Sequence, residues 1–252
     1  MNHSSPFFDA FSEVAEQYAA SRPRYPQYLF QTLAALAPGT QSAWDCATGN
    51  GQAAVGLAAH FQTVYATDAG VEQIAQAAPH PRIEYRVAPA DDSGLSERSV
   101  DMVSVATALH WFDLGRFYEE VRRVVRPHGL VAAYGYNWFY LTPALDELTN
   151  RWLIEPIHHY WSPSIRLLGD GYLTIDFPFE EVAAPPLAVH LQWNLEELFA
   201  YYLTWSATCE KIANEGNDFV AAARGAFEAA WGAPAERRHV VMPLALRFGR
   251  LP

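Results

Sequence analysis

The feature that most constrains the fold is a regular alternation of short apolar runs and helical segments between residues 42 and 136. The runs SAWDCA at 42–47, TVYATD at 63–68 and SVDMVSVA at 99–106 are typical of strands. A segment with helical periodicity, LGRFYEEVRRVVR at 114–126, follows the third of them. Because parallel strands are usually joined by helical crossovers, this pattern predicts βαβ units and a parallel sheet covered on both faces.

The regions on either side of this core are less regular. Residues 9–20 and 27–37 are predicted to be helical, with a break at SRPRYP because each proline disfavours the α conformation of the residue before it. Residues 141–160 look helical and 164–177 irregular, within a stretch rich in aromatics. The segments 180–193 and 239–250 are predicted to form an antiparallel pair at the sheet edge, with one helix from Asn194 between them.

From this pattern we predict one domain over residues 1–252. It comprises an N-terminal helical cap (1–40), a ligand-binding βαβ core (41–136), a helical and aromatic insertion (137–235) and a terminal sheet strand (236–252). Half of the 252 residues are apolar, enough for a sizeable core. The alternation and this composition together exclude a disordered or fibrous chain.

Charge and composition also narrow the partners. The formal net charge of −11 disfavours nucleic acid, whose phosphates need clustered Lys and Arg. No apolar run is long enough to cross a membrane, and no secretory signal pattern is visible, so we expect no membrane partner and a cytoplasmic protein. Cys46 and Cys209 are expected to be reduced thiols, and no Cys or His spacing suggests a metal site. A monomer or a homodimer is expected.

The most informative motif is AWDCATGNGQAA at 43–54, at a predicted strand-to-helix turn. Gly49 and Gly51 allow the backbone to approach a ligand closely, and the helix that follows directs free N–H groups toward the same crevice. Asp68 ends the next predicted strand, where a carboxylate can accept hydrogen bonds from a ribose diol. A glycine loop and a strand-end acid together predict a nucleoside-containing ligand.

Two ligand classes fit this loop. Gly49 to Ala54 also match G-x-G-x-x-A, the fingerprint of dinucleotide-binding proteins. However, Asp45 at the approach to the loop would repel a pyrophosphate and attract an ammonium or sulfonium ligand. A nicotinamide-dependent oxidoreductase and a non-catalytic nucleoside-binding protein of the same fold therefore remain as alternatives.

At these residues the chain resembles the class I S-adenosylmethionine-dependent methyltransferases, and more narrowly the methyltransferase type 11 group near the trans-aconitate methyltransferase-like proteins. The resemblance rests on WDCATGNGQAA, VYATDAG and APADDSGLSERSVDMVSVATALHWFD, and on the more selective strings HWFD and SRPRYP. It implies a Rossmann-like fold with a seven-stranded, mostly parallel sheet. It also implies S-adenosylmethionine as the methyl donor and S-adenosylhomocysteine as the product.

The resemblance further implies roles for single residues. The donor's methionine part and its ribose are expected at Asp45, Ala47, Gly49, Gly51 and Asp68. Other expected cofactor contacts are Ala90 and Asp91 near the adenine, Ala106 and Thr107 beneath the methionine chain, and Tyr18 and Arg22 closing over the site. The family often has glycine where this chain has Ala47. That difference costs little if φ is negative there, and about 1 kcal/mol or more if φ is positive.

The acceptor is expected to be a small molecule, with a carboxylate as one option. Because the sulfonium already activates the methyl group, a carboxylate acceptor needs no general base, whereas a phenol, thiol or carbon acid does. The candidates for proton transfer or positioning are His110 and Tyr18. The residues expected to line the acceptor site are His110, Trp111, Tyr134 and Trp138.

Overall fold

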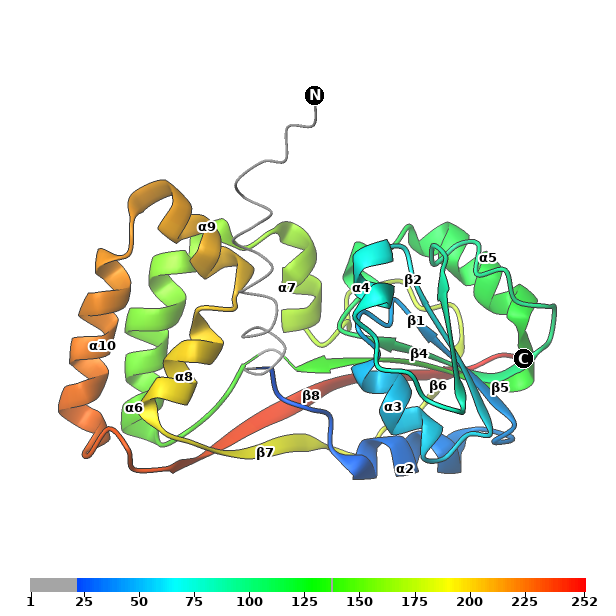
Figure 1. Ribbon diagram of the computed structural model, residues 1–252, viewed down its shortest axis with the longest axis horizontal. Helices are drawn as coiled ribbons and strands as arrows, with labels where there is room; N and C mark the ends of the chain where they lie inside the picture. The colour runs from blue at the N-terminus through cyan, green and yellow to red at the C-terminus, as the bar shows by residue number, and fades with distance from the viewer. Residues whose placement is uncertain (1–21, 137) are drawn as a thin grey trace. The chain divides into compact units, whose positions relative to one another are not determined.

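The computed structural model describes residues 22–136 and 138–252. These residues form an eight-stranded sheet in the order β3-β2-β1-β4-β5-β8-β6, with β7 paired to β8 (Figure 1). The strands are β1 Ser42–Cys46, β2 Thr63–Asp68, β3 Ile83–Val87, β4 Val100–Ala106, β5 Val125–Tyr136, β6 Glu180–Val182, β7 Ala188–Trp193 and β8 Arg238–Arg250.

Strands β1 to β5 are parallel to one another, whereas β8 is antiparallel to β5 and β6. The helices of the described residues are α2 Gln27–Leu36, α3 Gln52–Ala58, α4 Val71–Ala75, η1 Leu109–Trp111, α5 Leu114–Val124, α6 Pro143–Leu148, η2 Thr149–Ile154, η3 Glu155–Tyr160, α7 Pro163–Gly169, α8 Leu195–Tyr202, α9 Ser206–Glu215 and α10 Asp218–Trp231. The Rossmann-like, mostly parallel sheet is therefore confirmed, and β7 adds an eighth strand to the seven that were expected.

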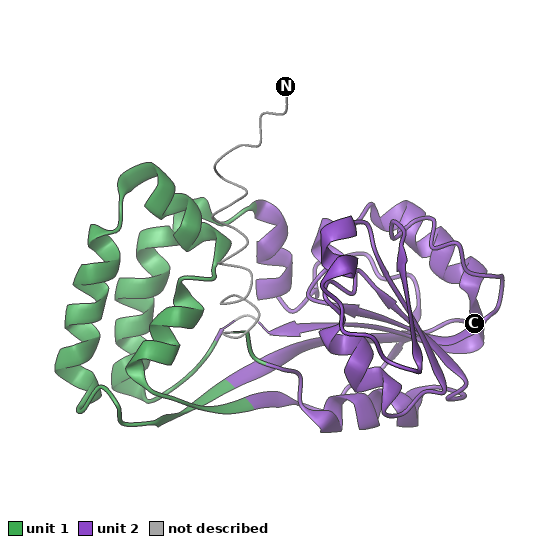
Figure 2. Ribbon diagram, viewed as in Figure 1, with its two compact units in different colours: residues 1–23, 139–162, 190–241 green, residues 24–138, 163–189, 242–252 purple. Residues whose placement is uncertain are grey.

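The chain divides into two compact units (Figure 2). Among the described residues, unit 1 comprises 22–23, 139–162 and 190–241, and unit 2 comprises 24–136, 138 and 163–189 together with 242–252. Unit 2 contains the βαβ core. Unit 1 contains helices α6 and α8 to α10 around an aromatic core that includes Phe139, Trp193 and Trp205. The single domain with its four segments stays a prediction.

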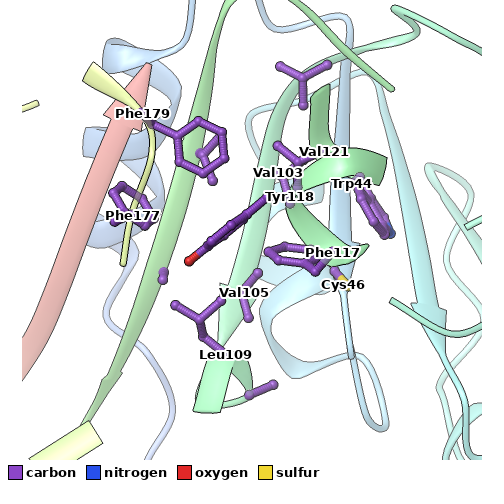
Figure 3. Packing of buried hydrophobic residues seen from close by; sticks show 14 of the residues in the cluster. Trp44, Cys46, Val103, Val105, Leu109, Phe117, Tyr118, Val121, Phe177 and Phe179 are labelled. Carbon is purple, nitrogen blue, oxygen red and sulfur yellow. The ribbon is translucent and has the colours of Figure 1, made fainter. Parts of the chain in front are cut away.

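Apolar side chains fill both faces of the sheet in unit 2. On one face, Phe117 and Val121 of α5 pack with Trp44, Val103 and Val105 (Figure 3). On the other, α2 and α3 pack against residues that include Val64, Met102 and Leu130. Strand β4 is therefore buried on both sides, which is why its sequence shows a nearly continuous apolar run.

Several local predictions were wrong, each for a physical reason. Residues 163–169 are helical, as α7, because packing of Leu168 against the core stabilises a helix that shows no clear periodicity in sequence. The run 180–193 forms two strands, β6 and β7, on either side of Pro185 and Pro186, whose rings provide no N–H for a sheet. By contrast, the predicted antiparallel pair at the sheet edge is confirmed, because β6 pairs antiparallel with β8 and β8 pairs with β5.

The predicted helix from Asn194 is capped as expected. The Asn194 side chain accepts from Glu197 N, and the Glu197 side chain accepts from Asn194 N. The helical segment then divides into α8 and α9, because Trp205 takes an extended conformation between them. The helix expected at 9–20 lies outside the described residues and stays a prediction. No helix that the structure describes is long and apolar enough to cross a membrane.

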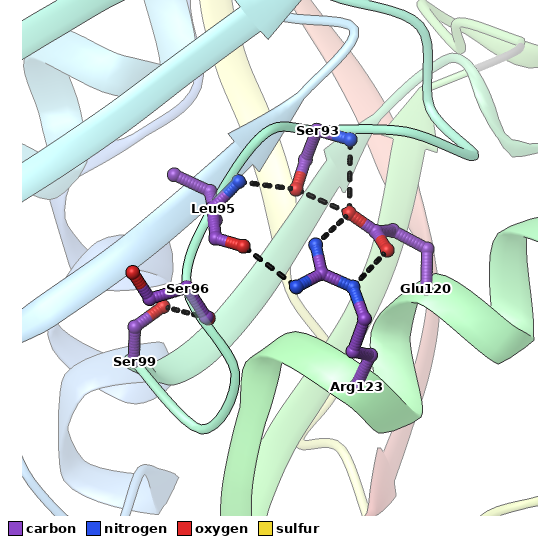
Figure 4. A network of polar contacts seen from close by, with 6 residues as sticks. All are labelled: Ser93, Leu95, Ser96, Ser99, Glu120 and Arg123. Carbon is purple, nitrogen blue, oxygen red and sulfur yellow. Dashed lines mark hydrogen bonds and ion pairs between the residues drawn. The ribbon is translucent and has the colours of Figure 1, made fainter.

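A buried carboxylate joins α5 to the loop before β4. Glu120 accepts hydrogen bonds from Ser93 N and from the Arg123 guanidinium, and Arg123 also donates to Leu95 O (Figure 4). Burial alone would raise the pKa of Glu120, but hydrogen bonds from Arg123 and Ser93 outweigh burial and keep this pKa below its ordinary value.

Replacing Glu120 with Ala should lower the free energy of unfolding by about 2 kcal/mol, because Ser93 N–H and Arg123 lose a buried partner. Urea unfolding measures this difference. Since the pKa is lowered in the folded protein, the contribution of Glu120 is present at neutral pH and disappears as the pH falls below 4.5, its ordinary pKa. The exposed neighbour variant Glu119→Ala should stay within about 0.5 kcal/mol of wild type. Equal losses in the two variants contradict this prediction.

Candidate functional site

The candidate site lies at the carboxyl ends of the parallel strands in unit 2. Asp45, in β1, is fully buried, and its two carboxylate oxygens accept hydrogen bonds from Thr48 Oγ1 at 2.6 Å and Ser104 Oγ at 2.8 Å. Ser104 also bonds to the Tyr134 hydroxyl at 2.8 Å. This network connects β1, the loop after it, β4 and β5. Asp45 is therefore a structural support beneath the loop.

Burial raises the pKa of Asp45 from 3.8 to about 6, despite hydrogen bonds from Thr48, Ser104 and the Ala54 backbone that lower it. Keeping this carboxylate ionised inside the fold therefore costs free energy, and the hydrogen bonds from its hydroxyl partners offset only part of that cost.

The loop after β1 turns through left-handed conformations. Ala47, Gly49 and Gly51 have φ values of 56°, 57° and 89°. The φ of 89° at Gly51 favours glycine, and a Cβ atom there would also lie 2.4 Å from the Tyr85 hydroxyl, so the Tyr85 side chain would have to shift. Of the two possibilities considered for Ala47 from the sequence, the structure shows the unfavourable one: its φ is positive, which costs about 1 kcal/mol or more.

Asp68, at the end of β2, fixes the loop from the neighbouring strand. Its Oδ2 accepts from Gly49 N at 2.9 Å, and its Oδ1 accepts from Gly70 N at 2.8 Å. A carboxylate offers about four acceptor positions, so both oxygens keep acceptor capacity for a ligand. The glycine loop and the strand-end acid, paired from sequence alone, are in direct contact.

A pocket of about 310 Å³ opens beside this contact. Its lining combines small side chains, three aromatic rings and three carboxylates. The full lining is Ala47, Asp68, Ala69, Ala88, Pro89, Ala90, Asp91, Trp111, Phe112, Asp113 and Phe117. None of these described residues is Lys or Arg. The pocket therefore suits hydrogen-bond donors and positive charge, and it disfavours an anion.

Four of the predicted cofactor residues, Ala47, Asp68, Ala90 and Asp91, thus line one pocket. Asp91 also pairs with the exposed Arg116 at 2.7 Å. Trp111, expected on the acceptor side, lines the same pocket and is 60% exposed. Sequence reasoning missed Phe112 and Asp113 as site residues, although both belong to the HWFD string.

Thr107 follows β4 and has a φ of 55°. Its backbone N–H donates to Tyr134 O at 2.7 Å, and its hydroxyl bonds to the Tyr25 hydroxyl at 2.6 Å. Ala106, the last residue of β4, is partly buried beside it. Sequence reasoning also missed Tyr25, although the SRPRYP string contains it.

His110 is buried, and its Nδ1 lies 3.1 Å from the Tyr172 hydroxyl. Burial lowers the pKa of His110 to about 4 and raises the pKa of Tyr172 well above 10. His110 is therefore neutral at pH 7. Although Trp111 lines the pocket described above, its neighbour His110 is not among the described residues that do so.

The remaining predicted residues lie elsewhere. Tyr134 is fully buried in the core beneath α2 and α3, so its predicted place in the acceptor-site lining needs correction. Trp138 is partly buried and is the last residue of the first chain segment of unit 2. Arg22 belongs to unit 1, where its guanidinium donates to Thr204 O and lies over the Tyr201 ring. Tyr18 lies outside the described residues, so its roles stay predictions.

Comparisons with known proteins agree with this geometry. The model of a family described as a methyltransferase domain matches residues 44–133. A Dictyostelium discoideum protein named as a methyltransferase is 30% identical over 204 residues, covering 79% of this chain and 78% of that protein. A Saccharomyces cerevisiae protein named as an S-adenosylmethionine-dependent methyltransferase is 32% identical over 135 residues, which cover 50% of this chain and 45% of that protein.

A solved structure is also similar. A protein described as a type II methyltransferase from Anaeromyxobacter dehalogenans is 43% identical, with a TM-score of 0.88. The match covers 92% of this chain and 99% of that one.

The raised pKa of Asp45 predicts a pH-dependent loss of stability. Between its ordinary pKa of 3.8 and the folded value of about 6, the folded state retains a proton that the unfolded state releases, so the Asp45 contribution falls as the pH rises. The lowered pKa of His110 makes its own contribution to stability rise with pH over an overlapping pH range. The test therefore compares wild type with Asp45→Asn, because His110 is present in both proteins. The stability difference between them should shift in favour of Asp45→Asn from pH 4 to pH 7 in urea titrations. The exposed Asp170→Asn variant should show no such shift, and parallel curves for wild type and Asp45→Asn contradict the prediction.

The left-handed conformation of Ala47 makes a second prediction. Ala47→Gly removes the strain but adds unfolded-state entropy, so its free energy of unfolding should equal that of wild type or exceed it by up to about 1 kcal/mol. Ala222→Gly, at an exposed site inside α10, should lose about 1 kcal/mol. Thermal unfolding of both variants provides the measurement. A loss at Ala47 as large as that at Ala222 means that no strain is relieved.

Proposed function

Because the chain belongs to the class I S-adenosylmethionine-dependent methyltransferases, we propose that it transfers the methyl group of S-adenosylmethionine to a small-molecule acceptor and releases S-adenosylhomocysteine. The observation that carries the proposal is the pocket beside the Gly49–Asp68 contact. Its carboxylates, small side chains and aromatic rings suit a nucleoside attached to a cationic sulfonium.

The residues present fit this donor. Asp68 keeps acceptor capacity for the two hydroxyls of a ribose. Ala69 and Ala90 leave room for a flat base, and the rings of Trp111 and Phe112 offer apolar surface on the same pocket. Asp91 can accept from an exocyclic amino group, and Arg116 already orients its carboxylate. The loop from Ala47 to Gly51 is then left for the methionine part.

The donor supplies an activated methyl group, so the chain has to position the acceptor and exclude water. Side chains suited to remove a proton at pH 7 are scarce around the described crevice. The pKa of His110 is lowered to about 4, and burial raises the pKa values of Tyr25 and Tyr172. An acceptor that is already ionised, such as a carboxylate, needs no base and is the acceptor class that we propose. It has to reach the sulfonium from outside this pocket, because the carboxylates of Asp68, Asp91 and Asp113 disfavour an anion inside it. His110 then acts as a neutral hydrogen-bonding group.

The alternative nicotinamide-dependent oxidoreductase is less well supported, because a pyrophosphate in this pocket would face Asp68, Asp91 and Asp113. A non-catalytic nucleoside-binding protein would use the same pocket, and only turnover separates it from an enzyme. A cytoplasmic location and a monomeric or homodimeric state stay predictions.

Titration calorimetry tests the proposal. Wild type should bind S-adenosylhomocysteine and S-adenosylmethionine, and Asp68→Ala should weaken the affinity for S-adenosylhomocysteine at least about tenfold, because hydrogen bonds to a charged group are lost. The exposed neighbour variant Asp92→Asn should bind as wild type does. Binding of NAD without binding of either S-adenosyl compound overturns the proposal.

A further inference from the structure

Thr107 has a strained backbone conformation and lies at the point of the sheet where the strand order reverses. The strand order reverses between β1 and β4, and ligands of open α/β sheets bind at such a reversal. Cys46 of β1 is paired with Val105 of β4, so Ala47 and Thr107 follow neighbouring strand ends. Both residues are left-handed, with φ values of 56° and 55°. For a β-branched residue such as Thr107 this conformation is a genuine outlier.

Backbone strain of this kind persists only where the surroundings enforce it, and it is concentrated at functional sites. Here two hydrogen bonds enforce it. Thr107 N donates to Tyr134 O at 2.7 Å, and Thr107 Oγ1 bonds to the Tyr25 hydroxyl at 2.6 Å. Gly135 makes room for the side chain, because a Cβ at Gly135 would lie 3.0 Å from Thr107 Oγ1.

Tyr25 is itself firmly positioned. Its ring meets the Tyr134 ring edge-on, with 5.0 Å between centroids, and lies 5.5 Å from the Tyr136 ring. Burial, more than any other cause, raises the pKa of Tyr25 well above its ordinary value, so the hydroxyl remains protonated at neutral pH. A neutral phenol that is packed against β5 can hold Thr107 without adding charge to the crevice.

Building on the proposed function, we propose that Tyr25 is a positioning residue for methyl transfer: its hydroxyl holds Thr107 in the left-handed conformation that shapes the end of β4 for the methyl donor. Tyr25 acts through Thr107 and need not touch the donor. The SRPRYP segment thereby contributes to the site a residue that the glycine loop and Asp68 do not supply.

Calorimetry with S-adenosylhomocysteine on folded protein tests this inference. Tyr25→Phe keeps the ring and removes one hydrogen bond, so the affinity should fall about fivefold, as expected for one net hydrogen bond. Thr107→Val, which cannot form the bond, should show the same loss, and Thr107→Ser should bind as wild type does. The double variant Tyr25→Phe/Thr107→Val should be no weaker than either single variant.

A rescue experiment separates positioning from general stabilisation. Glycine adopts the left-handed region without a partner, so adding Thr107→Gly to Tyr25→Phe should restore the affinity that Tyr25→Phe loses. The control is Tyr118→Phe, which removes a hydroxyl bonded to Asp176 O at 2.8 Å on the α5 face. This control should lower the melting temperature and leave the affinity unchanged.

The outcomes separate the two proposals. If wild type does not bind S-adenosylhomocysteine, the proposed function fails. If wild type binds it and Tyr25→Phe binds equally well, the positioning role of Tyr25 fails. If Tyr25→Phe binds weakly and Thr107→Gly does not restore the affinity, Tyr25 does not act through Thr107, and the inference is overturned.

Discussion

The buried carboxylate of Asp45 is the interaction on which the rest of the site depends. It connects β1 to the hydroxyls of Thr48 in the loop and Ser104 in β4, and through Ser104 to Tyr134 in β5. An ionised group in this position is costly unless it is hydrogen-bonded, so its partners cannot be removed independently. The loop after β1 therefore has one well-defined course, and its backbone N–H groups reach Asp68 on the next strand. The pocket lies beside this hydrogen-bonded loop and is lined by Ala47 and Asp68 among others.

Strain and support are paired along the same crevice. Ala47 and Thr107 both take left-handed conformations without being glycine, and both lie where a strand ends. Asp45 and Asp68 support the first turn, and Tyr25 and Tyr134 support the second. Arg98, His128 and Tyr172 are left-handed as well, but of these five described residues Ala47 and Thr107 follow the two strand ends at the reversal of strand order. Their strain therefore coincides with the place where open α/β sheets bind ligands.

Much of this fold could be predicted from sequence, because strands that are buried on both faces leave long apolar runs. The runs at β1, β2 and β4 and the amphipathic α5 identify a parallel sheet, and the spacing from Gly51 to Asp68 places both at one edge. The pairing of β8 with β5 could not be predicted in this way, because it joins segments far apart in the chain. The helix α7 depends on burial of Leu168, which local periodicity does not record.

The site shows the same division between local and long-range information. Asp68, Ala90 and Asp91 follow strand ends, so their meeting in one pocket follows from strand order. The different placement of His110 and Trp111 does not, because the η1 turn decides which of the two adjacent rings is buried against Tyr172 and which lines the pocket. Tyr25 lies 82 positions before Thr107, and only the folded chain brings their hydroxyls together. A selective string such as SRPRYP can thus contain a tyrosine whose chemical role depends on a partner that only the folded chain supplies.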